Sequence, residues 1–82
     1  MKLVELRQLN HYVFMLTFEN GEAKETDLKE LLEKYVDENH LNTAHLNKDW
    51  GCLEFNDGAV DIDPSTLYRY ASHKGNNHAI NH

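Results

Sequence analysis

The pattern of hydrophobic and polar positions predicts two strands at the start of the chain. Residues 2–9 alternate imperfectly between apolar and polar side chains. Residues 12–18 are aromatic, β-branched or apolar at every position, which is typical of a central strand covered on both faces. Three large side chains share one face of that strand, namely Phe14, Leu16 and Phe18.

A hairpin and an edge strand are expected next. Asn20 and Gly21 both tolerate positive φ, so this pair predicts a two-residue type I′ turn. The returning residues 22–26 include Glu22, Lys24 and Glu25, which are poor strand formers. We therefore expect an edge strand that is defended by charge.

An amphipathic helix is predicted to start at Asp27. Glu30 follows three residues later and completes a capping-box pattern. The apolar residues then repeat with helical spacing, while charged residues occupy the opposite side. This stripe, which we expect to pack on the sheet, consists of Leu28, Leu31, Leu32, Tyr35 and Val36.

Strand patterns return in the second half of the chain. Residues 43–46 suggest a short strand, and residues 50–55 alternate up to a second turn signal at Asp57 and Gly58. With these two residues in the turn, the returning residues 59–62 lie opposite residues 53–56. The register then places Phe55 opposite Val60 and Leu53 opposite Ile62.

The chain is expected to finish with a short helix and a tail. Asp63 followed by Pro64 is typical of a helix N-cap with proline at the first helical position, which predicts a helix from Pro64 to about Ala71. Residues 72–82 are polar and rich in Asn and His, so we expect a disordered tail after a single domain spanning residues 1–71. The predicted fold is α+β, in the order β-β-β-α-β-β-β-α, with one small, mostly antiparallel sheet carrying the amphipathic helix.

Composition places the chain among small globular proteins. Its 82 residues suffice for one domain with one core. No apolar run approaches the ~18 residues that cross a bilayer, and Glu5 interrupts the start of the chain too early for a secretory signal, so we expect a cytoplasmic protein. Because Cys52 is the single cysteine, an internal disulfide and a thiolate-based structural zinc site are both excluded.

The acidic balance indicates the kind of partner. Fourteen acidic against eight basic residues give a formal net charge of −6. This charge disfavours direct binding to nucleic acid and favours a basic protein partner. Homodimerisation through the edge strand at residues 22–26, or through an open sheet face, is a second expectation for so small a core.

Candidate chemical groups are few, and a structural role explains each of them better than catalysis. Asp61 and Asp63 point away from the core on one side of their strand, but Asp63 is explained as a helix cap and Asp61 as a surface group. Cys52, with Trp50 and Glu54 on its face, is interpreted as a half-buried structural thiol, although His45 could approach it. The spacing of the six histidines does not form a metal site, and they are interpreted as solvated: His11, His40, His45, His73, His78 and His82. We therefore expect no enzyme activity, no cofactor and no metal.

Aromatic residues near the second hairpin provide the remaining clue. Trp50, Tyr68 and Tyr70 could form an apolar interaction patch, or they could belong to the core, as aromatic residues of a small domain more often do. Together with Asp61 and Asp63 they form the candidate interaction surface.

Three segments resemble a widespread bacterial family known as domain of unknown function 2442. They are residues 13–21, which end in TFENG, residues 27–32, DLKELL, and residues 51–68, GCLEFNDGAVDIDPSTLY. Phe55 departs from the family pattern, in which tryptophan is common, and the second hairpin has one residue more before Pro64. The resemblance implies a small α+β domain, in some members joined to a helix-turn-helix domain and in several encoded beside small toxin-like proteins. With no room for a helix-turn-helix domain, this chain would need a partner to act on DNA.

Three functional hypotheses follow. The first is a non-enzymatic interaction or regulatory module, such as the acidic partner in a toxin–antitoxin-like complex. The second is an acidic mimic of nucleic acid that inhibits a nucleic-acid enzyme. The third, which the sequence supports least, is a small hydrolase that uses Asp61, Asp63 and a histidine; an unchanged phenotype after replacement of both aspartates with asparagine would remove it.

Overall fold

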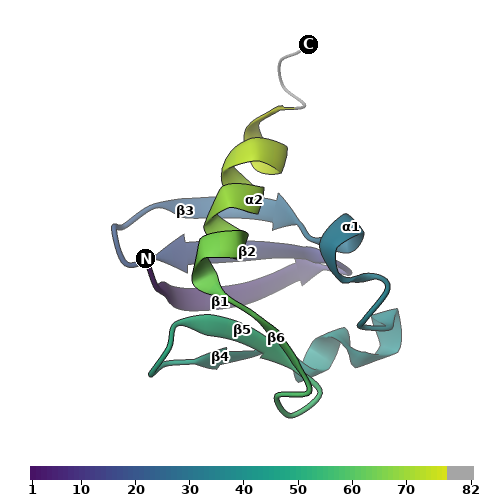
Figure 1. The fold of residues 1–82 in the computed structure, drawn as a ribbon. Coiled ribbons are helices and arrows are strands. Elements are labelled where there is room, and N and C mark those ends of the chain that lie inside the picture. Colours follow the sequence, from purple (N-terminus) through teal and green to yellow (C-terminus); the bar gives the residue numbers. More distant parts are fainter. Residues whose placement is uncertain (78–82) are drawn as a thin grey trace.

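The computed structural model describes the backbone of residues 1–77 and the side chains of residues 1–72. It contains two antiparallel sheets of three strands each and a few helices, in agreement with the α+β class (Figure 1). Sheet A has the strand order β1-β2-β3, and sheet B has the order β4-β5-β6. The strands are β1 Leu3–Asn10, β2 Val13–Phe18, β3 Ala23–Asp27, β4 His45–Asn47, β5 Cys52–Phe55 and β6 Val60–Ile62. The helices are α1 Lys29–Leu32, the 3₁₀ helix η1 Glu38–Thr43, and α2 Pro64–Asn77.

The prediction of one continuous sheet is wrong, because the strands divide into two sheets. Figure 1 shows α2 lying across the strands of sheet A, with sheet B on the β1 side, where β1 contacts β4. The two sheets are joined by the long connection through α1 and η1. No helix within residues 1–77 is long and apolar enough to cross a membrane.

The core lies on one face of sheet A. Phe14, Leu16 and Phe18 are fully buried on that face, as predicted from their alternation. The ring of Phe14 meets Phe55 of sheet B edge to face at 6.2 Å, and the ring of Phe18 meets Tyr68 of α2 at 5.1 Å. Sheet B and α2 therefore cover the same face of sheet A.

The opposite face of sheet A corrects the prediction that β2 is covered on both sides. Val13, Met15 and Thr17 alternate with the buried residues of β2 and are only half-buried. Their apolar and β-branched character reflects strand propensity as well as burial. We call the face that carries these three side chains the outer face of sheet A.

The predicted amphipathic helix is reduced to the four residues of α1. Leu28, not Asp27, occupies the N-cap position of α1, although Asp27 Oδ1 still accepts the N–H of Lys29, the first helical residue, at 3.0 Å. The segment after α1 is tied to the β1–β2 turn, because the Tyr12 hydroxyl donates to the carbonyl of Val36 at 2.7 Å. The predicted stripe is still partly correct, since Leu28, Leu32 and Val36 are buried, although Tyr35 is 67% exposed.

The first predicted hairpin has a different turn from the one expected. Phe18 and Glu22 are hydrogen-bonded across a three-residue loop, and only Gly21 in it has positive φ, at 93°. Asn20 keeps negative φ and accepts the N–H of Glu22 through its side-chain oxygen at 3.0 Å. A type I turn followed by a glycine in the left-handed region has this geometry.

The register of the second hairpin is confirmed. Phe55 pairs with Val60 and Leu53 pairs with Ile62. Positive φ begins one residue earlier than the turn signal indicates, at Asn56, and the N–H of that residue donates to Thr43 Oγ1 at 2.8 Å.

The start of α2 is confirmed, whereas its end lies beyond the predicted one. Asp63 Oδ1 accepts the N–H of Thr66 at 2.8 Å, and Pro64 is the first helical residue. The hydrogen bond from Thr66 holds the pKa of Asp63 below its ordinary value. The helix continues past Ala71 to Asn77, so the first part of the predicted tail is helical, and residues 78–82 lie outside the described residues.

Candidate functional site

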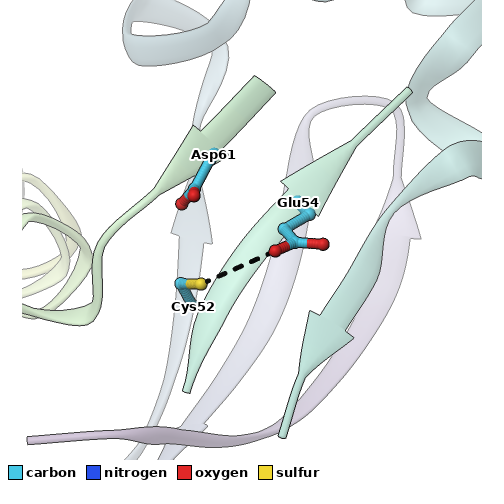
Figure 2. Close-up of side chains that lie close together, drawn as sticks. All are labelled: Cys52, Glu54 and Asp61. Atoms are coloured by element: carbon cyan, nitrogen blue, oxygen red, sulfur yellow. Dashed lines mark hydrogen bonds between the residues drawn. The ribbon is translucent and has the colours of Figure 1, made fainter. Parts of the chain in front are cut away.

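Three potential ligand residues gather on the outward face of sheet B. Glu54 of β5 and Asp61 of β6 are paired in register, and Cys52 lies two residues before Glu54 on the same face. Figure 2 shows the three side chains on one side of the two strands, with the Cys52 sulfur directed toward Glu54. One ligand atom from each residue lies within 4.8 Å of the other two. We call this group the Cys52 cluster.

Neighbouring residues hold Glu54 in place and extend the site. Asn47 donates from Nδ2 to Glu54 Oε2 at 3.0 Å. His45 pairs with Glu54 from the β4 side, so a row of His45, Glu54 and Asp61 crosses all three strands of sheet B. A pocket of about 530 Å³ lies at this row; its lining residues are Thr43, Ala44, His45, Glu54, Asp57 and Gly58.

The environment of Cys52 keeps its thiol protonated. The residue is 5% exposed, and its sulfur lies 3.9 Å from Glu54 Oε2. Burial is the main cause that raises the pKa of the Cys52 thiol, and the negative charges of Asp61 and Glu54 raise that pKa further. A protonated thiol is a weak nucleophile, so the geometry fits a structural cysteine better than a catalytic one.

This electrostatic environment predicts slow chemistry at Cys52. At pH 8 the folded protein should react with a disulfide reagent such as DTNB about 100-fold more slowly than the urea-unfolded chain, because the thiol is both buried and protonated. Asp61→Asn should raise the rate, because it removes a negative charge that disfavours the thiolate. Stopped-flow absorbance measures both rates. Rapid reaction of the folded wild-type protein would contradict the assignment.

Two kinds of ligand suit the donor atoms of the cluster. A thiolate and two carboxylates are ligand types that a divalent transition metal accepts, once the thiol loses its proton. The two carboxylates could instead accept hydrogen bonds from the ammonium or guanidinium group of a basic partner. A basic group leaves the Cys52 thiol protonated, which is the form that the raised pKa of this thiol favours.

The structure separates the candidate interaction residues. Trp50 lies in the turn before β5, its side chain is exposed (73%), and its backbone N–H donates to Asn47 Oδ1 at 3.2 Å. The ring of Tyr68 packs on Phe18, and the Tyr68 hydroxyl donates a hydrogen bond to the carboxylate of Glu22.

Tyr70 packs against the core and is half-buried. Asp61 joins the Cys52 cluster, while the side chain of Asp63 caps α2.

One member of the Cys52 cluster, Glu54, is not among the candidate residues predicted from the sequence. Alternation predicts Glu54 as a neighbour of Cys52 on the same face of the strand, and the structure adds its proximity to Asp61. The signal was present, because pairing Leu53 with Ile62 also pairs Glu54 with Asp61. Among the histidines, His11 forms an ion pair with Glu38, and His45 lies at the site without belonging to the Cys52 cluster.

Comparison with known proteins gives one result. The model of the family described as "Protein of unknown function (DUF2442)" matches residues 3–73. No curated protein and no solved structure matches the chain. The matched region covers both sheets and most of α2, and it confirms the resemblance found in the three sequence segments. The chain therefore belongs to the DUF2442 family of proteins of unknown function.

Proposed function

We propose that the protein is a non-enzymatic interaction module that binds a basic segment of a partner protein on the outward face of sheet B. The observation that carries this proposal is the pairing of Glu54 with Asp61, whose carboxylates lie together beside a protonated thiol. Two neighbouring carboxylates can accept several hydrogen bonds from one arginine or lysine side chain. A basic group bound there would also relieve the repulsion between the two acids.

The surroundings of the two acids favour such a ligand. Asn47 fixes the Glu54 carboxylate by a hydrogen bond, so less side-chain entropy is lost when a partner binds. The exposed ring of Trp50, in the turn that leads into β5, offers a face on which a guanidinium group can stack. The net charge of −6 accelerates the approach of a basic protein.

A toxin–antitoxin-like complex is the finer form of this proposal. In it, the acidic chain would cover a basic surface that the partner needs for its own activity. If that surface binds nucleic acid, the acidic face would act as a mimic of the phosphate backbone, which is the alternative function. Competition by DNA or RNA distinguishes the two forms.

The proposal is tested by affinity purification of the tagged chain from its native cells at low and high salt. We expect one basic protein at fixed stoichiometry, identified by mass spectrometry and light scattering. The purified pair is then titrated by calorimetry with the double variant Glu54→Gln/Asp61→Asn. Loss of both charges should weaken binding at least about 10-fold, since each buried charge-assisted hydrogen bond contributes more than 1 kcal/mol.

A matched control removes the same charge elsewhere. Glu33→Gln/Asp37→Asn neutralises two exposed acids on the segment around α1 and should leave the affinity nearly unchanged. Equal weakening by the two double variants would mean that only net charge matters and would refute a site on sheet B. Recovery of the bare chain at both salt concentrations would refute the module itself.

A further inference from the structure

The outer face of sheet A carries a row of residues with opposite charges at its two ends. Arg7 of β1 pairs with Met15 of β2, and Met15 pairs with Glu25 of β3. Arg7 and Glu25 are exposed, and Met15 is half-buried between them. Adjacent strands lie about 4.8 Å apart, so the backbones of Arg7 and Glu25 are about 10 Å apart, with Met15 between them. Within the described part of the chain, neither forms a salt bridge.

This row is complementary to itself. We propose that the outer face of sheet A binds the same face of a second copy of the chain. The two copies would be related by a two-fold axis that lies between the two faces and runs parallel to β2. Such an axis brings Arg7 of each copy over Glu25 of the other and places Met15 over Met15. The apolar and β-branched side chains of Val13, Met15 and Thr17 would form the centre of the contact, flanked by two ion pairs.

The neighbouring rows agree with this orientation. On one side of the central row, the same axis places Glu5 over Ala23; on the other, it places Asn10 over Asp27. No two like charges of these rows are then opposed.

A two-fold axis perpendicular to the strands gives a different result. It would place Arg7 over Arg7 and Glu25 over Glu25, which costs electrostatic energy. Of the two axes that pass through the row of Met15, the charges therefore favour the one parallel to β2.

The edges of sheet A are less suited to a second copy than its face. On β1 the register with β2 shifts at Val4 and again at Leu9, and such bulges interrupt the ladder that an added strand needs. On β3, the side chain of Lys24 lies 5.9 Å above the ring of Tyr68, and α2 contacts the strand. Pairing through residues 22–26, one of the two modes expected from the sequence, is thus disfavoured relative to pairing through the face.

The area of the outer face of sheet A determines the expected affinity between the two copies. Three strands about 4.8 Å apart and six residues long present a projected area of roughly 300 Å². Stable dimers bury about 800 Å² on each partner, so the dimer should be weak, with dissociation constants on the order of 10–1000 μM. The proposal is independent of the binding function assigned to sheet B, whose residues it does not use.

A charge-reversal experiment tests the proposal. Sedimentation equilibrium of the whole chain between about 20 and 500 μM should show a monomer–dimer equilibrium for the wild type. Arg7→Glu and Glu25→Arg should each weaken self-association at least about 10-fold, because like charges would then be opposed. An equimolar mixture of the two variants should form a heterodimer, since every contact then joins opposite charges. The double variant Arg7→Glu/Glu25→Arg should recover the wild-type equilibrium.

Controls keep the result decisive. Glu33→Lys and Lys34→Glu reverse exposed charges outside the face and should leave the dimer unchanged. Met15→Cys, which lies on the axis, should be cross-linked by a short bismaleimide, whereas Tyr35→Cys should not. A wild-type chain that stays monomeric throughout, or a mixture of folded variants that fails to associate, would overturn the proposal. If a charge variant does not fold, the cross-linking pair decides by itself.

Discussion

Replacing Gly51 with alanine is expected to unfold most of the protein at room temperature. Gly51 has φ of 71°, a conformation that costs a residue with a side chain about 1–2 kcal/mol. An added Cβ would lie 2.4 Å from Lys2 Cβ and 2.8 Å from Lys2 Cα. Because Lys2 Cα belongs to the backbone, no rotamer change removes this clash. The hydrogen bond from the N–H of Leu3 to the carbonyl of Gly51, 3.0 Å long, would be lost with the close approach.

The combined cost of Gly51→Ala should reach roughly 4 kcal/mol, which is close to the whole stability of a domain of this size. Urea unfolding followed by circular dichroism measures the change. Gly21→Ala is the matched control, because Gly21 also has positive φ, at 93°, but nothing lies within 4 Å of its added Cβ. That variant should lose only about 1 kcal/mol. Equal losses for the two variants would show that backbone strain, and not the contact with Lys2, determines the effect.

The contact at Gly51 also links the fold to the proposed binding face. Gly51 lies between Trp50 and Cys52, so the start of β1 fixes the turn that presents Trp50 at one end of the Cys52 cluster. Asn47 fixes the same turn from the other side by accepting the N–H groups of Asp49 and Trp50. A partial loss of this contact should therefore weaken partner binding before the domain unfolds.

Local signals predicted the parts of the fold that depend on neighbouring residues. The register of Phe55 with Val60 follows from a turn signal and from alternation, and both operate within ten residues. The cap of α2 by Asp63 is equally local. The sequence predicts the position of the first turn correctly and its type wrongly, because Asn20 does not have positive φ and instead accepts the N–H of Glu22 through its side chain.

Contacts between distant residues caused the errors. One such contact joins Tyr12 to the carbonyl of Val36, which fixes the segment that follows the short helix α1, and no local pattern encodes that bond. The division into two sheets likewise depends on which strands meet after the chain passes α1 and η1. The imperfect alternation of the first strand, in contrast, had a physical meaning, since its irregular positions Val4 and Leu9 are the bulges.

The candidate sites show the same difference between features that local patterns predict and features that depend on contacts between distant residues. Cys52 and Glu54 were placed on one face by alternation alone, and the correct register already implied the contact of Glu54 with Asp61. The half-buried position of Tyr68 does not follow from local patterns, because it depends on the packing of α2 against Phe18. The self-complementary row on sheet A also needed the pairing of all three strands, which local patterns did not provide.

Phe55→Ala is expected to destabilise the protein by about 3–5 kcal/mol, because it leaves a cavity where the two sheets meet. Phe55 is fully buried, and its ring packs edge to face on Phe14 at an interplanar angle of 83°. Phe55→Leu keeps most of the volume and should cost less than about 1.5 kcal/mol. Tyr35→Ala, at a 67% exposed residue, should change stability by less than about 0.5 kcal/mol.

Denaturant midpoints of the three variants test this order, with the slope of each transition as a check on two-state behaviour. Hydrogen exchange adds the structural detail. Because Phe55 joins sheet B to sheet A, its loss should reduce protection in β5 and β6 together with β2, as one cooperative unit. If β2 kept wild-type protection while β5 and β6 exchanged freely, the two sheets would be independent in stability. Sheet B would then be stabilised only by the pairing of its own strands. A bound partner would have to provide the stabilisation that the contact of Phe55 with Phe14 provides in the intact core.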